Sequence, residues 1–127
     1  MKRFLLIGLL LAWFPVVALA DTFDDILTQM RAANAKELVK YFSGSVELTL
    51  LDNEGIYSKQ QAEQMLRNFF NQNPPKNLNI QHKGASGQGA KYAIATYEST
   101  NGRFRTYLFL KDSGNGLLIH EFRIERE

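Results

Sequence analysis

The stretch KYAIATYESTNGRFRTYLFLK, residues 91–111, decides the fold of this chain. Apolar and polar residues alternate on both sides of Asn101-Gly102, which is the period of a half-buried strand. Asn-Gly between two alternating runs is a strong signal for a two-residue hairpin turn, because both turn positions favour positive φ angles. The stretch therefore predicts two antiparallel strands, at 91–99 and 103–111.

The predicted turn also sets a register and two chemically different faces. With Asn101-Gly102 as the loop, Tyr97 pairs with Thr106, and continuing across the next loop pairs Leu108 with His120. One face is mostly apolar, and we expect the helices to cover it. Its candidate pocket-lining residues are Tyr97, Thr106, His120 and Phe122. The other face is charged at one end and carries apolar interface candidates at the other, namely Ile94, Tyr107, Phe109 and Ile119.

Outward from the hairpin, residues 78–83 and 117–125 read as two further strands. The facing of the first of these, Leu78–Lys83, stays open because the glycine-rich loop at 84–89 can hold a bulge. Three helix patterns precede them: one at 23–33, a short one between the Asn34 cap and Gly44, and one from the Ser58 cap to Pro74-Pro75. A strand at 46–50 and a turn at 52–55 separate the last two helices. The sequence predicts an α+β domain, with three N-terminal helices on an antiparallel sheet.

The first 20 residues have the pattern of a secretory signal peptide. Lys2 and Arg3 precede an apolar run at 4–17, and Ala-Leu-Ala at 18–20 supplies a small-x-small cleavage site. The apolar run is short for a membrane span and Pro15 interrupts it, which favours cleavage over an uncleaved anchor. We therefore expect an exported protein, periplasmic or extracellular, with a single mature domain at 21–127 and no stable membrane anchor.

Composition excludes several classes of function. The chain has 15 basic and 13 acidic residues, and the leader carries two of the basic ones, so 13 of each remain after cleavage. A neutral domain gives little support to nucleic-acid binding. Because there is no Cys, thiol-linked lipids, disulfides and cysteine metal sites are excluded. The only histidines in the sequence, His82 and His120, lack the spacing of a zinc site, so we expect neither a metal nor a cofactor.

Four segments carry a resemblance to a known family: NAKELVKYFSGSVELTL at 34–50, EGIYSKQQAEQMLRNFF at 54–70, NPPKNLNIQHKG at 73–84, and the hairpin stretch above. They resemble an exported bacterial family, domain of unknown function 4783, within the nuclear-transport-factor-two-like (cystatin-like) superfamily. The resemblance covers essentially the whole mature chain and implies a cone-shaped fold on a long curved sheet. It implies no particular activity, because superfamily relatives include isomerases, cyclases, dehydratases and dimeric non-enzymes.

The residues leave three functional hypotheses. The leading one is a non-enzymatic module that binds a small apolar ligand in the cone, or a partner or second copy, as a homodimer, on the outer sheet face. The alternative is a small isomerase- or dehydratase-like enzyme, in which His120 is the acid–base group and Tyr97 orients the substrate. A third is a filled cone that serves as a subunit of an envelope assembly. Because the predicted register places no carboxylate beside His120, it favours a non-enzyme.

Overall fold

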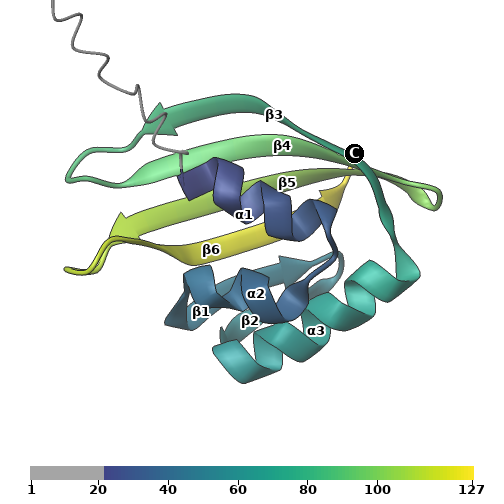
Figure 1. Cartoon of the computed structure of the whole chain (residues 1–127), viewed down its shortest axis with the longest axis horizontal. Helices are drawn as coiled ribbons and strands as arrows, with labels where there is room; N and C mark the ends of the chain where they lie inside the picture. Colours follow the sequence, from purple (N-terminus) through teal and green to yellow (C-terminus); the bar gives the residue numbers. More distant parts are fainter. Residues whose placement is uncertain (1–21) are drawn as a thin grey trace, which may run out of the picture.

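The computed structural model describes residues 22–127, and the predicted signal peptide lies outside them. This part of the chain forms three helices, a short 3-10 turn and six strands (Figure 1). In chain order these elements are α1 (Thr22–Arg31), α2 (Ala35–Leu38), the 3-10 turn η1 (Val39–Tyr41), β1 (Phe42–Leu50), β2 (Asn53–Ser58), α3 (Lys59–Gln72), β3 (Pro75–Ala85), β4 (Lys91–Ser99), β5 (Gly102–Asp112) and β6 (Leu117–Arg126).

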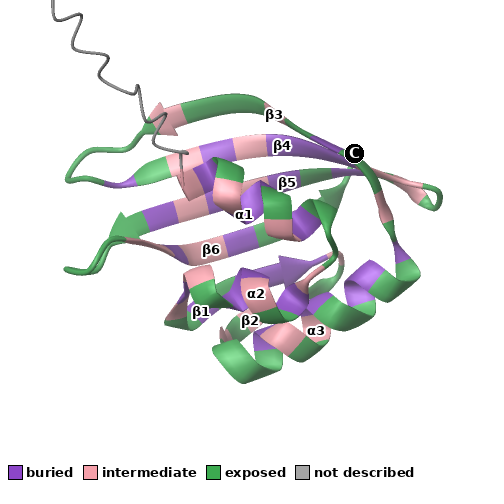
Figure 2. Cartoon of the chain, in the orientation of Figure 1, coloured by how far each residue is buried: buried purple, intermediate pink, exposed green. Residues whose placement is uncertain are grey.

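The strands form one six-stranded sheet in the order β2-β1-β6-β5-β4-β3. Neighbours are antiparallel except β1 and β6, which run parallel. Figure 1 shows α1 lying across the longer strands, with α2 and α3 beside β1 and β2. Figure 2 shows buried positions along β1 and β4, and the apolar sides of the helices pack against them. The predicted α+β class, with helices on one side of a mostly antiparallel sheet, is confirmed.

The third helix begins and ends where its sequence signals predict. The backbone N–H of Gln61 donates to Ser58 Oγ at 3.3 Å, and the N–H of Ser58 donates to Gln61 Oε1 at 3.2 Å, which completes a capping box. Its apolar side buries Ala62, Leu66, Phe69 and Phe70. The helix ends at Gln72, before the two prolines, because proline cannot continue the hydrogen-bond ladder.

Two predicted boundaries between 34 and 58 are wrong. Asn34 caps α2 as expected, since Glu37 N–H donates to its Oδ1 at 3.1 Å, but the helix does not continue to Gly44. The chain extends from Phe42 onwards, because β1 pairs there with β6. The predicted turn at 52–55 is instead a two-residue loop, Leu51–Asp52, and the polar segment after it forms the edge strand β2.

The central hairpin has the predicted strands but a different register. Ser99 pairs with Gly102, so the loop is Thr100–Asn101, and every β4–β5 pair is displaced by two positions. The side-chain amide of Asn101 donates to the carbonyl of Gln72, which ties the loop to the end of α3. Because side chains alternate with a period of two, a displacement of two leaves each residue on its predicted face.

A bulge in β6 changes the facing of two candidate residues. Phe109 pairs with Glu121 and Leu110 with Ile119, so His120 is an extra residue on β6. Ile119 is consequently fully buried, at 0% exposure, and is not on the outer face as predicted. His120 lies on the outer face beside Phe109 and Glu121, and not on the helix-covered face. Because side chains alternate along a strand, one extra residue reverses the facing of the residues on one side of it. This explains why Ile119 and His120 lie on the opposite faces from those predicted.

Candidate functional site

The interior of the cone is filled at the predicted pocket residues. Tyr97, Thr106 and Phe122 are each 0% exposed. The Tyr97 hydroxyl donates to the carbonyl of Asn73, and the ring centroid of Phe69 lies 5.6 Å from that of Tyr97. Burial raises the pKa of Tyr97. The pocket that the isomerase hypothesis requires is therefore occupied by protein side chains, and His120 is not among them.

A second buried polar group lies in the same interior. Thr106 Oγ1 has no hydrogen-bond partner within residues 22–127. A buried hydroxyl without a partner lowers stability, but without space beside it the group has no route to a substrate. Thr106 pairs with Ala95 and Ile124 on the adjacent strands, both of which are buried. The polar members of this face are thus parts of the core.

The outer sheet face carries a cluster of partly exposed aromatic and apolar side chains, which we call the outer patch: Tyr92, Ile94, Tyr107 and Phe109. Tyr92 and Tyr107, from β4 and β5, stack with ring centroids 6.4 Å apart and an interplanar angle of 29°. His82 of β3 extends the row, with Nε2 2.9 Å from the Tyr92 hydroxyl oxygen. Strand alternation in β4 already points Tyr92 to the same side as Ile94, so the sequence contained a signal for this residue.

Edge strand β3 supports the outer patch through a glycine. Leu78 is buried, but a register shift between Ile80 and His82 turns the second half of the strand and leaves His82 exposed. Gly84 lies under the Tyr92 ring, where an added Cβ would come within 2.5 Å of a ring carbon. The ring therefore covers a position on β3 that only glycine leaves open. The facing that the sequence left undecided is settled by this bulge.

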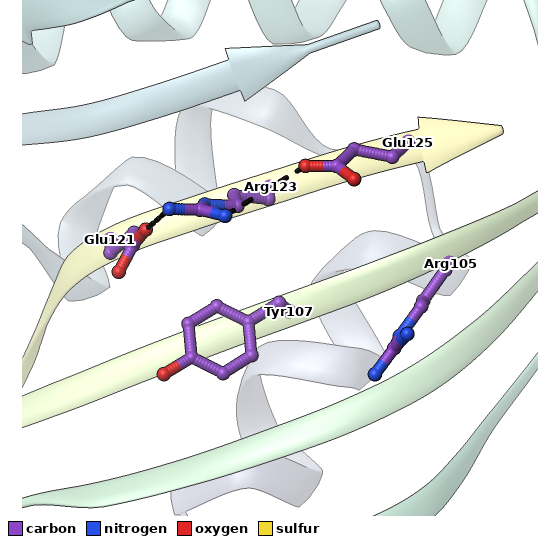
Figure 3. Close-up of a pocket in the computed structure, with 5 residues that line it drawn as sticks. All are labelled: Arg105, Tyr107, Glu121, Arg123 and Glu125. Carbon is purple, nitrogen blue, oxygen red and sulfur yellow. Dashed lines mark ion pairs between the residues drawn. The ribbon is translucent and has the colours of Figure 1, made fainter.

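Charged side chains border the outer patch along β6. Arg123 pairs with Glu121 at 2.5 Å and with Glu125 at 3.9 Å, and its guanidinium lies 6.0 Å from the centre of the Tyr107 ring. Figure 3 shows Glu121, Arg123 and Glu125 in a row, with Tyr107 and Arg105 on the neighbouring strand. These five residues line a depression of about 330 Å³. Partial burial and the Glu121 carboxylate raise the pKa of Tyr107, and Arg123 offsets part of the effect.

Two further depressions lie on the same face, around Ile56. One of about 270 Å³ is lined by residues that include Phe109, Lys111 and His120, and one of about 250 Å³ by residues that include Glu54. Ile56, which lines both, is 70% exposed on edge strand β2. His120 Nε2 is buried there without a hydrogen-bond partner within the described residues. Sequence reasoning missed Ile56 because it did not predict β2.

Among residues 22–127 no group of three or more His, Asp or Glu side chains is arranged to hold a metal ion. In the same range no helix has the length and apolar character needed to cross a membrane.

Comparison with known proteins places the chain in a family. The model of DUF4783, a domain of unknown function, matches residues 23–125. A DUF4783 family protein from Bacteroides ovatus is 31% identical, with 80% of this chain and 92% of that chain covered and a TM-score of 0.75. A second, from Bacteroides uniformis, is 24% identical, with 84% and 98% covered and a TM-score of 0.78. No curated protein matches the chain.

A more distant structure extends the likeness of the fold. A domain of unknown function with a cystatin-like fold from Nostoc punctiforme is 7% identical, with 80% of this chain and 70% of that chain covered and a TM-score of 0.65. At this identity the likeness shows the fold alone. The chain belongs to the DUF4783 family, and its domain has the nuclear-transport-factor-two-like (cystatin-like) fold.

Proposed function

We propose that this protein is a non-enzymatic, exported module that binds a second copy of itself through its outer sheet face. The observation that carries the proposal is the outer patch: Tyr92, Ile94, Tyr107 and Phe109 lie on the side of the sheet that α1–α3 do not cover. Aromatic residues and arginine are enriched at the centres of protein interfaces. Partly exposed aromatic side chains grouped on two adjacent strands, β4 and β5, provide the kind of surface that such an interface needs.

Charge on the outer face is self-complementary. The side formed by β2, β1 and β6 carries more acidic than basic side chains, since Arg123 is its one cation among the residues that line the three depressions, whereas β5 contributes Arg105 and Lys111. The acidic residues are Glu54, Glu47, Glu121 and Glu125. A two-fold axis parallel to the strands, passing between β5 and β6, lays the acidic side of one copy over the basic side of the other. The outer patch on β4 and β5 then lies beside this axis and packs against β6 and β1 of the other copy, where it supplies buried area, while the opposite charges align the two copies.

The filled interior supports a non-enzyme over the isomerase-like alternative. Acid–base catalysis requires a titratable group within reach of a bound substrate. Tyr97 and Thr106 are enclosed in the core, and His120 lies across the sheet from them. The small apolar ligand that the sequence suggested has no space at these residues either. The leader sequence at 1–20 is the support for export.

The experiment is light scattering of the purified protein across a range of concentrations. We expect a dimer for the wild type and a monomer for Tyr107→Asp. Dimer formation would bury the new carboxylate in the interface with the second copy, and burying an unpaired charge is costly. Asn71→Asp, an exposed position on α3, is the matched control and should remain a dimer. Phe109→Arg, also in the patch, repeats the test with the opposite charge.

Unfolding curves accompany these measurements, so that loss of the dimer is separated from loss of the fold. A wild-type monomer at high micromolar concentration would overturn the proposal. So would a Tyr107→Asp variant that is folded and still dimeric, because a dimer formed elsewhere on the surface would not respond to this substitution.

A further inference from the structure

A depression on the helix side of the sheet, away from the outer patch, lies between the β1–β2 loop and α3. Its volume is about 450 Å³, larger than the depressions on the outer face. It is lined by Leu50, Leu51, Asp52, Asn53, Met65, Asn68, Phe69 and Gln72. The four helical members, at 65, 68, 69 and 72, occupy positions i, i+3, i+4 and i+7, so they project from one side of α3. The space is within the size range of small-molecule sites in proteins.

The depression has an apolar floor and a polar rim. Leu50 and Phe69 are each 5% exposed, and Leu51 and Met65 are half-buried beside them. Asp52, Asn53, Asn68 and Gln72 are exposed above this floor. The side-chain amides of the last three make no hydrogen bond within residues 22–127, so their donors and acceptors are available to a ligand.

The backbone of the loop is strained at the floor. Leu51 has a φ angle of +57°, a conformation in which a leucine side chain is disfavoured and which glycine, asparagine or aspartate usually supplies. Its N–H donates to the carbonyl of Ile124 at 2.8 Å, which holds the loop against β6. Unfavourable backbone conformations that persist in a fold are concentrated at functional sites. Glycine at position 51 would relieve this strain but would contribute no side chain. Leucine adopts the strained conformation and places an apolar side chain at the floor of the depression.

The lining determines the chemistry of a ligand. No basic residue lines the depression, and Asp52 is its one charged residue. An anionic ligand would therefore be repelled by Asp52 and would find no cationic side chain to pair with. Amide groups both donate and accept hydrogen bonds, which suits hydroxyl groups. A ring with hydroxyl groups around its edge and C–H groups on one face fits this lining. The hydroxyl groups would contact the polar rim, and the C–H face would pack on the apolar floor. The geometry points to a binding site for a neutral sugar ring, independent of the proposed self-association.

The test is a titration of the ¹⁵N-labelled protein with three neutral sugars, glucose, N-acetylglucosamine and cellobiose, followed by NMR. We expect at least one sugar to shift the backbone amides of 51–53 and the side-chain amides of Asn53, Asn68 and Gln72, with a Kd of about 1 mM. Glucuronate, which adds a carboxylate to the glucose ring, should bind at least several-fold more weakly because of Asp52.

Leu51→Gly removes the strained apolar side chain and should weaken sugar binding about tenfold while the protein stays folded. Gln88→Gly is the matched control, because Gln88 also has a positive φ angle, of +52°, but lies in the loop between β3 and β4. It should leave binding unchanged. The absence of shifts with all three sugars at concentrations well above 1 mM would overturn the proposal, as would equal binding by the Leu51→Gly variant or shifts confined to other parts of the surface.

Discussion

Replacing Tyr97 with phenylalanine should destabilise the domain, although the ring itself is retained. The Tyr97 hydroxyl is the donor for the carbonyl of Asn73, the residue at the C-terminal cap of α3. Tyr97 is 0% exposed and Asn73 is 7% exposed, so water cannot take the place of the lost donor. A buried acceptor left without a partner costs about 1–3 kcal/mol of stability.

The assay is thermal unfolding, with urea denaturation as a second measurement. One kcal/mol corresponds to a change of about 4 °C in Tm for a domain of this size, so we expect a decrease of about 4–12 °C for the Tyr97→Phe variant. Tyr41→Phe is the matched control, because it deletes a hydroxyl that makes no hydrogen bond within residues 22–127. Surface changes of that kind stay within about 0.5 kcal/mol. Equal decreases in Tm for Tyr97→Phe and Tyr41→Phe would show that the hydrogen bond from Tyr97 to Asn73 does not stabilise the domain.

The same residue predicts a pH dependence. Burial raises the pKa of Tyr97 above the ordinary tyrosine value of about 10. As the pH rises above about 10, the unfolded chain releases this proton and the folded chain retains it, so the free energy of unfolding falls by about 1.4 kcal/mol per pH unit until the folded pKa is reached. Phenylalanine has no such proton. The stability gap between wild type and Tyr97→Phe should therefore narrow above about pH 10, and a constant gap would contradict a buried, protonated hydroxyl.

Three other substitutions test separate parts of the fold. Ser58→Ala removes the capping box with Gln61 and should cost about 1 kcal/mol in urea denaturation; an unchanged midpoint would show that the cap is dispensable. Leu66→Ala, at a position with 0% exposure, should cost about 2–5 kcal/mol by the same measurement, and a loss below about 1 kcal/mol would contradict tight packing there. Gly84→Ala places a Cβ 2.5 Å from the Tyr92 ring, so the ring must move and the His82 ring signals should shift in NMR; unchanged signals would rule out the described contact.

The parts of the fold that sequence reasoning found are those with local signals. The capping residues lie within a few positions of the helix starts that they set, so Asn34 and Ser58 could be identified without the tertiary structure. The alternation in β4 and β5 likewise lies within each strand. Because a displacement of two preserves facing, the prediction placed Tyr107 and Phe109 on the outer face even with the wrong hairpin loop.

The candidate site was harder to predict, because it depends on contacts between distant segments. Strand β2 has little apolar alternation, and only its pairing with β1 makes it a strand, so Ile56 had no signal. The bulge at His120 arises where β6 must pair with β1 on one side and β5 on the other. Nothing near His120 in the sequence indicates the extra residue, and its predicted place in the interior was therefore wrong.

The sequence by itself determined the class of the fold, the starts of the helices capped by Asn34 and Ser58, and the alternating faces of the central hairpin, since these depend on interactions within short segments. The tertiary structure decided the register, the bulge and the closure of the cone. Those features follow from long-range contacts, such as that of Asn101 with Gln72 and that of Tyr97 with Asn73. Their free energies depend on which groups meet across the domain, and one-dimensional patterns do not contain that information.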